Sequence, residues 1–354
     1  MNNNISDILN SESIEATAPC RIDMGGTLDI SSFYYPLSYL DPCTFNIALS
    51  LRTRVSIRPH KKGYVKISSK GFDSAESAVE KLPFDHPMGL MFAIAAYFQI
   101  DGIHIHIESG SPPRSALGGS SVAAVALVAA FNQLLGKTDA SVVPFEKIPL
   151  LAHGIEESVA GVPCGLQDQL AAVFGGVNAW HWKGIGAFQP YVRQPVIGPL
   201  HYKALSEHLL VAYCGIPHKS KNINSQWVKQ FISGTHRSRW VEIVQLTRSF
   251  VEALSRFDID EAISLMNRET AIRVEMTPDV LDDTGRELVN TALVHGCGAR
   301  FTGAGGGGCI WALGEKEKIV KLRNAWEPIL SGIDAAGLLD VSIDSDGLLL
   351  GAKG

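Results

Sequence analysis

The sequence lacks a strong excess of charge of either sign and a long apolar run. It carries 31 basic and 36 acidic residues in 354, a formal net charge of −5, which argues against a nucleic-acid binder. The longest apolar run, Val122–Phe131, is about half the ~20 residues that a membrane-spanning helix requires. We therefore expect neither nucleic acid nor a membrane as a partner.

Closely spaced cysteines are also missing. The six cysteines form no CxxC or similar pair; they are Cys20, Cys43, Cys164, Cys214, Cys297 and Cys309. This spacing favours reduced thiols over a zinc site or a disulfide framework. The polar start of the chain has no basic segment followed by an apolar one, as a secretory signal would have. These features predict a cytoplasmic protein.

Strand-like and helix-like segments occur in both halves of the chain, without the regular alternation of a parallel α/β fold. Ile103–Glu108 (IHIHIE) alternates apolar and polar residues as a half-buried strand does, and Ser120–Leu135 predicts a helix. His104 and His106 share one strand face; an exposed polar face is the ordinary interpretation, and a pair of metal ligands is the alternative. The pattern predicts an α+β fold.

The length suits two domains of ordinary size. Around Tyr191–Leu200 (YVRQPVIGPL) the chain carries two prolines and loses helical periodicity. We therefore expect one domain over residues 1–190 and a second over residues 191–354.

The first of two glycine-rich segments is Ser111–Ala124 (SPPRSALGGSSVAA), between the predicted strand and the predicted helix. Gly118 and Gly119 allow the backbone to approach a ligand closely. Ser120 and Ser121 lie where a helix start offers unpaired N–H groups and the positive end of its dipole. The segment favours an anion site, with a tight turn capped by serine as the alternative. It is not a Walker A loop, because no Gly-Lys-Ser/Thr follows.

The second glycine-rich segment is Gly303–Gly308 (GAGGGG). It satisfies GxGxxG, but the residues that follow, CIWAL, predict a strand where a dinucleotide fingerprint requires a helix. Ordering so many glycines costs backbone entropy. Close approach to a ligand or to another backbone is therefore the better interpretation.

Two further segments carry clustered charges. Ala18–Ile30 (APCRIDMGGTLDI) contains Arg21, which could pair with a carboxylate or phosphate, and Asp29, which could bind hydroxyls. In EESVAGVPCGLQDQ, a turn separates Glu156 from Asp168, and such a pair can divide into a metal ligand and a base. Taken alone, these segments also fit a polar strand end and a solvated helix face.

In their order, the four segments resemble the GHMP kinases, named for galactokinase, homoserine, mevalonate and phosphomevalonate kinases. The stretches that carry the resemblance are APCRIDMGGTLD, PPRSALGGSS, GVPCGLQDQ and GARFTGAGGGGC. PCGLQDQ, LAAVFGGVNAW and GGTLD are most similar to the bacterial heptose kinases and to galactokinases. The resemblance implies a domain like ribosomal protein S5 domain 2, then a ferredoxin-like domain, with the active site between them.

The resemblance also implies a role for each segment. Asp168 would be the catalytic base, and Arg21 would keep it ionised and stabilise the transferred phosphoryl group. ATP would be bound by Arg114, Ser115, Ala116, Leu117, Gly118, Gly119, Ser120 and Ser121, together with Gly303, Ala304, Gly305 and Gly306. Mg²⁺ would be held by Ser120 and Glu156, with Ser121 and Glu157 as alternatives. The substrate would be bound by Gly26, Asp29, Gly165 and Asp168.

Three departures bear on the substrate and on the metal ligands. GGTLD lacks the Glu-His pair of galactokinases, and Leu28 separates Thr27 from Asp29 where heptose kinases carry Gly-Gly-Gly-Thr-Asp. Gly119 replaces a serine of the usual phosphate loop. None of these departures removes a group that phosphoryl transfer requires.

We therefore expect an ATP- and Mg²⁺-dependent kinase that phosphorylates a sugar or sugar phosphate at the anomeric hydroxyl, giving a sugar 1-phosphate. The expected substrate is heptose- or galactose-like, and the protein is expected to be a monomer or homodimer. The alternatives are a kinase for a non-sugar alcohol such as mevalonate, and a silent member that binds nucleotide or sugar. Arg21, Glu156 and Asp168 are all present, which argues against the silent alternative.

Overall fold

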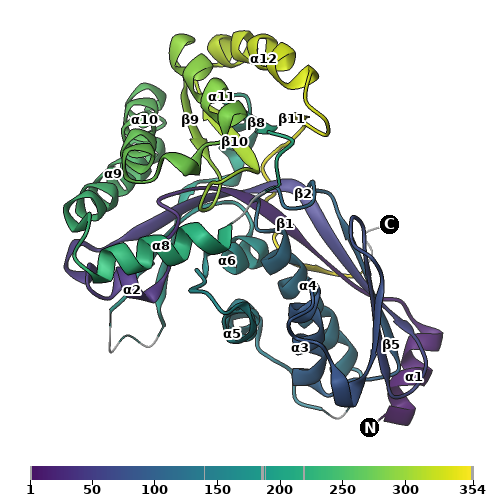
Figure 1. Ribbon diagram of the computed structural model, residues 1–354. Coiled ribbons are helices and arrows are strands. Elements are labelled where there is room, and N and C mark those ends of the chain that lie inside the picture. Colours follow the sequence, from purple (N-terminus) through teal and green to yellow (C-terminus); the bar gives the residue numbers. More distant parts are fainter. Residues whose placement is uncertain (1, 139, 185–186, 188, 218–219, 352–354) are drawn as a thin grey trace.

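The computed structural model describes residues 2–138, 140–184, 187, 189–217 and 220–351. It contains two β-sheets, each covered by helices, which lie one above the other in Figure 1. The prediction of an α+β fold is confirmed.

The first sheet is built around one long strand, β2 (Cys43–Pro59). One edge of β2 pairs with β1 (Ile14–Met24). The other edge pairs with β6 (Val177–Trp182) near its start and with β5 (Ile103–Ser109) near its end. The remaining strands of this sheet are β3 (Tyr64–Ser69), β4 (Ala75–Ala78), β7 (Tyr191–Ile197) and β12 (Leu349–Leu350). Only the β3–β5 pair is parallel among the described strands.

Helices cover one face of this sheet: α3 (Gly89–Phe98), α4 (Gly119–Leu135), α5 (Ile148–Ala160) and α6 (Gln167–Phe174). The apolar run Val122–Phe131 is buried throughout, because α4 is packed against the sheet and against the other three helices. A helix that is apolar on all sides is expected in such a central position. The packing brings the starts of α4 and α6 to the end of β1, where the candidate site lies. Two further helices lie in the N-terminal part of the chain, α1 (Asn2–Ser11) and α2 (Ser31–Tyr34).

The second sheet is antiparallel, in the order β11 (Gly337–Leu339), β8 (Leu209–Tyr213), β10 (Cys309–Leu313) and β9 (Gly298–Phe301). Its helices are α7 (Tyr202–Ser206), α8 (Ser220–Ile232), α9 (Arg237–Ser255), α10 (Ile259–Met276), α11 (Asp283–Val294) and α12 (Lys316–Ser331). Helix α10 packs along β9 and against α9, and α9 also contacts β2 and β7 of the first sheet. The two halves therefore share a packed boundary.

The change from one sheet to the other does not fall at the predicted position. The predicted boundary after residue 190 lies between the paired strands β6 and β7 of the first sheet. Pro195 is accommodated because β7 is an edge strand, where a missing N–H leaves no ladder bond unmade. Sheet membership changes between Ile197 and Leu209 instead. Near its end the chain returns to the first sheet, where Asp344 forms an ion pair with Arg52 and β12 pairs with β1.

The alternation in IHIHIE has the expected structural consequence. Ile103, Ile105 and Ile107 are buried, whereas His104 and His106 lie on the other face and each hydrogen bonds to Ser68 Oγ, at 2.8 and 2.9 Å. Across the part of the chain that the structure describes, no group of three or more His, Cys, Asp or Glu side chains could hold a metal ion. The polar-face interpretation of the two histidines is the one that the structure supports.

Candidate active site

The centre of the candidate site is a buried ion pair between Arg21 on β1 and Asp168 in the first turn of α6. Arg21 Nε donates to Asp168 Oδ1 at 2.8 Å, and Nη2 lies 2.7 Å from the same oxygen. The Arg21 side chain is 4% exposed and that of Asp168 is 21% exposed. Asp168 is therefore held by the arginine and still accessible to a ligand.

The first glycine-rich segment wraps around this pair. Arg21 Nη1 donates to the carbonyl oxygen of Ala116 at 2.7 Å, and the Arg21 N–H donates to that of Leu117 at 3.2 Å. Gly118, with φ of +80°, precedes α4, and a Cβ there would lie 3.0 Å from Asp168 Oδ2. A glycine is needed at this point because the backbone turns with positive φ against a carboxylate. Arg114 in the same loop is exposed and Ser115 is buried.

Ser121, rather than Ser120, faces the glutamate predicted to bind metal. Ser121 Oγ donates to Glu156 Oε2 at 2.8 Å, and Gln169 Nε2 donates to the same oxygen at 2.7 Å. Ser121 is buried, whereas Ser120 and Glu157 are exposed. Burial raises the pKa of Glu156 to about 7, and Asp168 contributes in the same direction. Glu156 is thus a half-buried carboxylate held by two neutral donors.

Asp29 lies beside Gly165, close to the start of α6. Asp29 Oδ2 accepts the backbone N–H of Gln167 at 3.0 Å, at the start of α6. A Cβ on Gly165 would lie 1.8 Å from the same oxygen, so only glycine fits there. Burial raises the pKa of Asp29 to about 6, with Asp168 and Asp23 contributing in the same direction.

The second glycine-rich segment, between β9 and β10, lies against the first. A Cβ on Gly308 would lie 2.7 Å from the carbonyl oxygen of Ser115, and one on Gly303 would lie 3.4 Å from Arg21 Nη2. Gly303, Gly305, Gly306, Gly307 and Gly308 all have positive φ. This part of the second domain therefore approaches another backbone closely, as the glycine content suggested.

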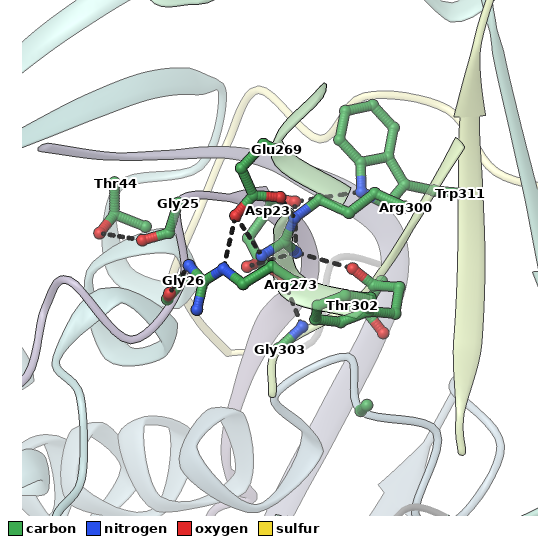
Figure 2. Close-up of polar contacts among 12 residues, drawn as sticks. Asp23, Gly25, Gly26, Thr44, Glu269, Arg273, Arg300, Thr302, Gly303 and Trp311 are labelled. Atoms are coloured by element: carbon green, nitrogen blue, oxygen red, sulfur yellow. Dashed lines mark hydrogen bonds and ion pairs between the residues drawn. The ribbon is translucent and has the colours of Figure 1, made fainter. Parts of the chain in front are cut away.

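A buried row of alternating charges links the two domains. Figure 2 shows four of its members, Asp23, Arg300, Glu269 and Arg273. Arg300 Nη1 lies 3.2 Å from Asp23 Oδ2, and Arg300 Nε donates to Glu269 Oε2 at 2.8 Å. Arg273 Nε donates to Glu269 Oε1 at 2.8 Å, and Arg273 Nη2 donates to the carbonyl oxygen of Gly26 at 2.8 Å. We call the six charged residues involved the ion chain: Asp168, Arg21, Asp23, Arg300, Glu269 and Arg273.

The charges in the ion chain act on one another's protonation. Burial opposes the ionisation of Glu269, but Arg300 and Arg273 hold its pKa below its usual value. Burial raises the pKa of Asp168, and this effect outweighs the opposing effect of Arg21. Arg21 therefore favours the ionised form of Asp168, as expected of a neighbouring positive charge, but burial has the larger effect and the net pKa is raised.

The structure thus brings together the residues predicted from four distant segments: Arg21, Gly26 and Asp29, the loop 114–121, Glu156 with Gly165 and Asp168, and the loop 303–306. Sequence reasoning missed Asp23, Gln169, Glu269, Arg273 and Arg300. A glutamate and an arginine four residues apart, as in α10, ordinarily form an exposed helix pair. Nothing in that spacing shows that both side chains are fully buried here.

None of the described helices is both long and apolar enough to cross a membrane. A carboxylate paired with an arginine, where a glycine turn and a helix start meet, is suited to a group-transfer reaction on a phosphorylated ligand. The fold and the site together define a two-domain phosphotransferase-like protein.

Comparisons with known proteins give the family. The family model described as "GHMP kinases N terminal domain" matches residues 86–176, and "GHMP kinases C terminal" matches residues 250–329. A mevalonate kinase of Pyrococcus horikoshii is 26% identical over 298 residues, covering 75% of this chain and 80% of the relative. The chain belongs to the GHMP kinase family.

Solved structures share the fold. A galactokinase of Lactococcus lactis, solved with galactose, aligns with a TM-score of 0.71 at 18% identity, covering 98% of both chains. A D-glycero-D-manno-heptose 1-phosphate kinase of Bacteroides thetaiotaomicron aligns with a TM-score of 0.72 at 17% identity, covering 96% of this chain and 99% of that one. The expected two-domain GHMP kinase fold is confirmed.

Proposed function

We propose that this protein is an ATP- and Mg²⁺-dependent kinase that transfers the γ-phosphoryl group to a hydroxyl of a small sugar. The observation that carries the proposal is the Arg21–Asp168 ion pair, held against the Gly118 turn at the start of α4. Phosphoryl transfer requires little covalent chemistry from the protein, so positioning and charge stabilisation do most of the work.

Asp168 would act as the base that accepts the proton of the attacking hydroxyl. Because burial raises its pKa, Asp168 is a stronger base than an exposed aspartate. Arg21 would stabilise the negative charge of the group in transfer while fixing the orientation of the Asp168 carboxylate. The contact to the Ala116 carbonyl keeps the guanidinium beside the phosphate loop.

The nucleotide would lie against the first glycine-rich loop and the start of α4. Residues 114–121 would supply backbone N–H groups, and the start of α4 would supply the positive end of its dipole. The second-domain loop, Gly303 to Gly306, would border the same phosphates, since it already lies against Ser115 through Gly308.

The residues present fit a magnesium ion. Glu156 is a half-buried carboxylate whose described hydrogen-bond partners are neutral, which makes an added cation favourable there. The side-chain oxygen of Gln169, which is buried, has no hydrogen-bond partner among the described residues. We propose Glu156 and Ser121 as the protein ligands, with Ser120 as the alternative. When bound, Mg²⁺ would neutralise phosphate charge, and oxygen ligands of this kind suit it.

The acceptor would be held by Gly26, Asp29 and Gly165 beside Asp168. We propose a heptose- or galactose-like acceptor phosphorylated at the anomeric hydroxyl, giving a sugar 1-phosphate. This proposal is supported by GGTLD and PCGLQDQ, which resemble the sugar kinases of the family. The alternative is a non-sugar alcohol, because mevalonate kinases are among the curated relatives.

A coupled assay of ADP release with Mg·ATP tests the proposal. The panel contains free hexoses, heptose 7-phosphate, mevalonate and homoserine, and ³¹P NMR of the product identifies the phosphorylated hydroxyl. Turnover of mevalonate alone would replace the sugar proposal with the alternative. ATP binding without turnover of any acceptor would favour a silent, ligand-binding member.

Replacing the proposed base tests the mechanism. Asp168→Asn is nearly isosteric but cannot take a proton, so we expect kcat to fall by about 10²- to 10⁴-fold. ATP binding, measured by calorimetry, should be mostly retained. Asp260→Asn, at an exposed position of α10, is the control and should leave kcat unchanged. Turnover of Asp168→Asn within a few-fold of wild type would remove Asp168 from the base role.

A further inference from the structure

Asp23 is the member of the ion chain whose carboxylate joins the catalytic pair to the second domain. It is fully buried near the end of β1, two residues after Arg21. Its two carboxylate oxygens have different partners. Oδ1 accepts the backbone N–H of Gly303 at 2.7 Å and lies 3.5 Å from Arg21 Nη1, whereas Oδ2 lies 3.2 Å from Arg300 Nη1.

The backbone at Asp23 is held by the second domain as well. Its carbonyl oxygen accepts from Trp311 Nε1 at 3.0 Å and from Arg300 Nη1 at 3.2 Å (Figure 2). At the other end of the ion chain, Arg273 holds the carbonyl oxygen of Gly26, in the segment proposed to bind the acceptor. The second domain therefore holds the β1 end at two points on either side of Met24.

We propose that Asp23 is a positioning residue that couples the second-domain glycine loop, 303–308, to the orientation of Arg21 and hence of Asp168. The inference rests on the proposed phosphoryl transfer for its kinetic consequence, but the coupling itself is a property of the protein without ligands. Asp23 Oδ1 contacts both the Gly303 N–H and Arg21, so a movement of Gly303 also displaces the carboxylate that helps to hold Arg21. The position of loop 303–308 and the alignment of Arg21 with Asp168 therefore change together.

The space around the Asp23 side chain determines which substitution can test this coupling. A Cβ on Gly26 would lie 2.4 Å from Asp23 Oδ2, so the side chain is closely surrounded and glutamate would not fit. Asparagine has nearly the same shape and removes only the charge. In Asp23→Asn, the Gly303 N–H loses a charged acceptor and Arg21 loses its second carboxylate.

The double variant Asp23→Asn/Arg300→Met removes one negative and one positive charge together. It leaves the pairs Arg21–Asp168 and Arg273–Glu269 balanced. The double variant can therefore replace Asp23→Asn in the experiments if the single variant does not fold. Asp344→Asn is the matched control, because Asp344 pairs with Arg52 between the C-terminal segment and the first sheet, away from the site.

Hydrogen exchange with mass spectrometry, on the full chain without ligand, tests the coupling directly. We expect Asp23→Asn to speed exchange about tenfold in the peptide over residues 302–308, as one charge-assisted hydrogen bond is weakened. Exchange should also rise near residues 114–118, since Arg21 holds that loop. Asp344→Asn should leave both peptides as in wild type. Unchanged exchange in Asp23→Asn would overturn the coupling.

Kinetics then separate positioning from a general loss of stability. We expect kcat of Asp23→Asn to fall about 10- to 100-fold with little change in KM for the acceptor, as for a small misplacement of a catalytic group. The acid limb of the pH–kcat profile should move to lower pH. The reason is that the Asp23 charge raises the pKa of Asp168, and the variant lacks that charge. The other charged neighbours of Asp168 are unchanged in the variant; they are Arg21, His153, Glu156 and Asp29.

The two proposals fail in different ways. A wild-type protein that phosphorylates no acceptor, with faster loop exchange in Asp23→Asn, would sink the kinase proposal and support the coupling. An active wild type whose Asp23→Asn and double variants keep kcat within a few-fold, with an unmoved acid limb, would overturn the positioning role. If only the double variant folds, the same exchange and kcat outcomes decide the question.

Discussion

Alanine at Gly165 is predicted to disrupt the acceptor side of the site through a single contact. The Cβ of Gly165→Ala would lie 1.8 Å from Asp29 Oδ2 and 2.3 Å from Asp29 Cγ. The Asp29 carboxyl would have to move by roughly 1.5 Å to restore ordinary van der Waals separation. Because Oδ2 also accepts the Gln167 N–H at 3.0 Å, that movement breaks the hydrogen bond at the start of α6.

The cost has two parts. Overpacking in a close-packed region costs about 1–3 kcal/mol. Losing a charged acceptor for the buried Gln167 N–H costs about 1.5–3 kcal/mol. We therefore expect the free energy of unfolding to fall by about 2.5–6 kcal/mol in Gly165→Ala, measured by urea denaturation. Asp168 lies in the same first turn of α6, so acceptor KM should rise as well.

The controls isolate the contact from the general effect of replacing a glycine. Gly154→Ala, at an exposed position of α5 with no atom within 4 Å of its Cβ, should stabilise the protein by about 0.5–1 kcal/mol. In Asp29→Ala/Gly165→Ala the clashing carboxyl is absent, so the double variant should lose less stability than the sum of the two single changes. Additive losses, or a Gly165→Ala protein as stable as Gly154→Ala, would refute the argument.

Two further predictions concern the carboxylates of the site. Ser121→Ala should raise the Mg²⁺ concentration for half-maximal activity at least several-fold more than Ser120→Ala, because Ser121 contacts Glu156; the opposite order would exchange their roles. Asp29 has a pKa raised to about 6, so the stability that its neutral form contributes is present at low pH and lost as pH rises through 6. As the pH is raised from 4.5 to 7.5, the free energy of unfolding of Asp29→Asn, measured by urea denaturation, should therefore increase relative to that of wild type. A difference between the two proteins that does not change with pH would contradict the raised pKa.

The segments that form the site could be found in the sequence because each has a local signature. Glycines that allow close approach, a serine at a helix start and a lone arginine in an apolar strand are visible without the fold. The choice between Ser120 and Ser121 depended on which side of α4 faces α5. Successive helical residues point about 100° apart, so an error of one residue exchanges an exposed side chain for a buried one.

The parts that were missed depend on long-range packing. The sequences of β6 and β7 have only a weak strand pattern, and Pro195 suggested a domain boundary where the structure has an edge strand. Asp23, Glu269 and Arg300 come from β1, α10 and β9, and meet only because the second sheet docks on the end of the first. Charged residues are ordinarily exposed, so their burial could not be inferred without their partners.

The charge balance of the site explains why the ion chain matters for the proposed chemistry. Its three arginines and three carboxylates compensate one another, so the chain can be buried without leaving an unpaired charge at the domain boundary. Asp29 and Glu156 stand apart, since neither has an ion pair among the described residues, and burial raises both pKa values, to about 6 and 7. The protein therefore places two carboxylates without an ion-pair partner near Asp168. A divalent cation at Glu156 and hydroxyl donors at Asp29 would relieve that cost on binding, which is what a kinase for a polyhydroxylated acceptor requires.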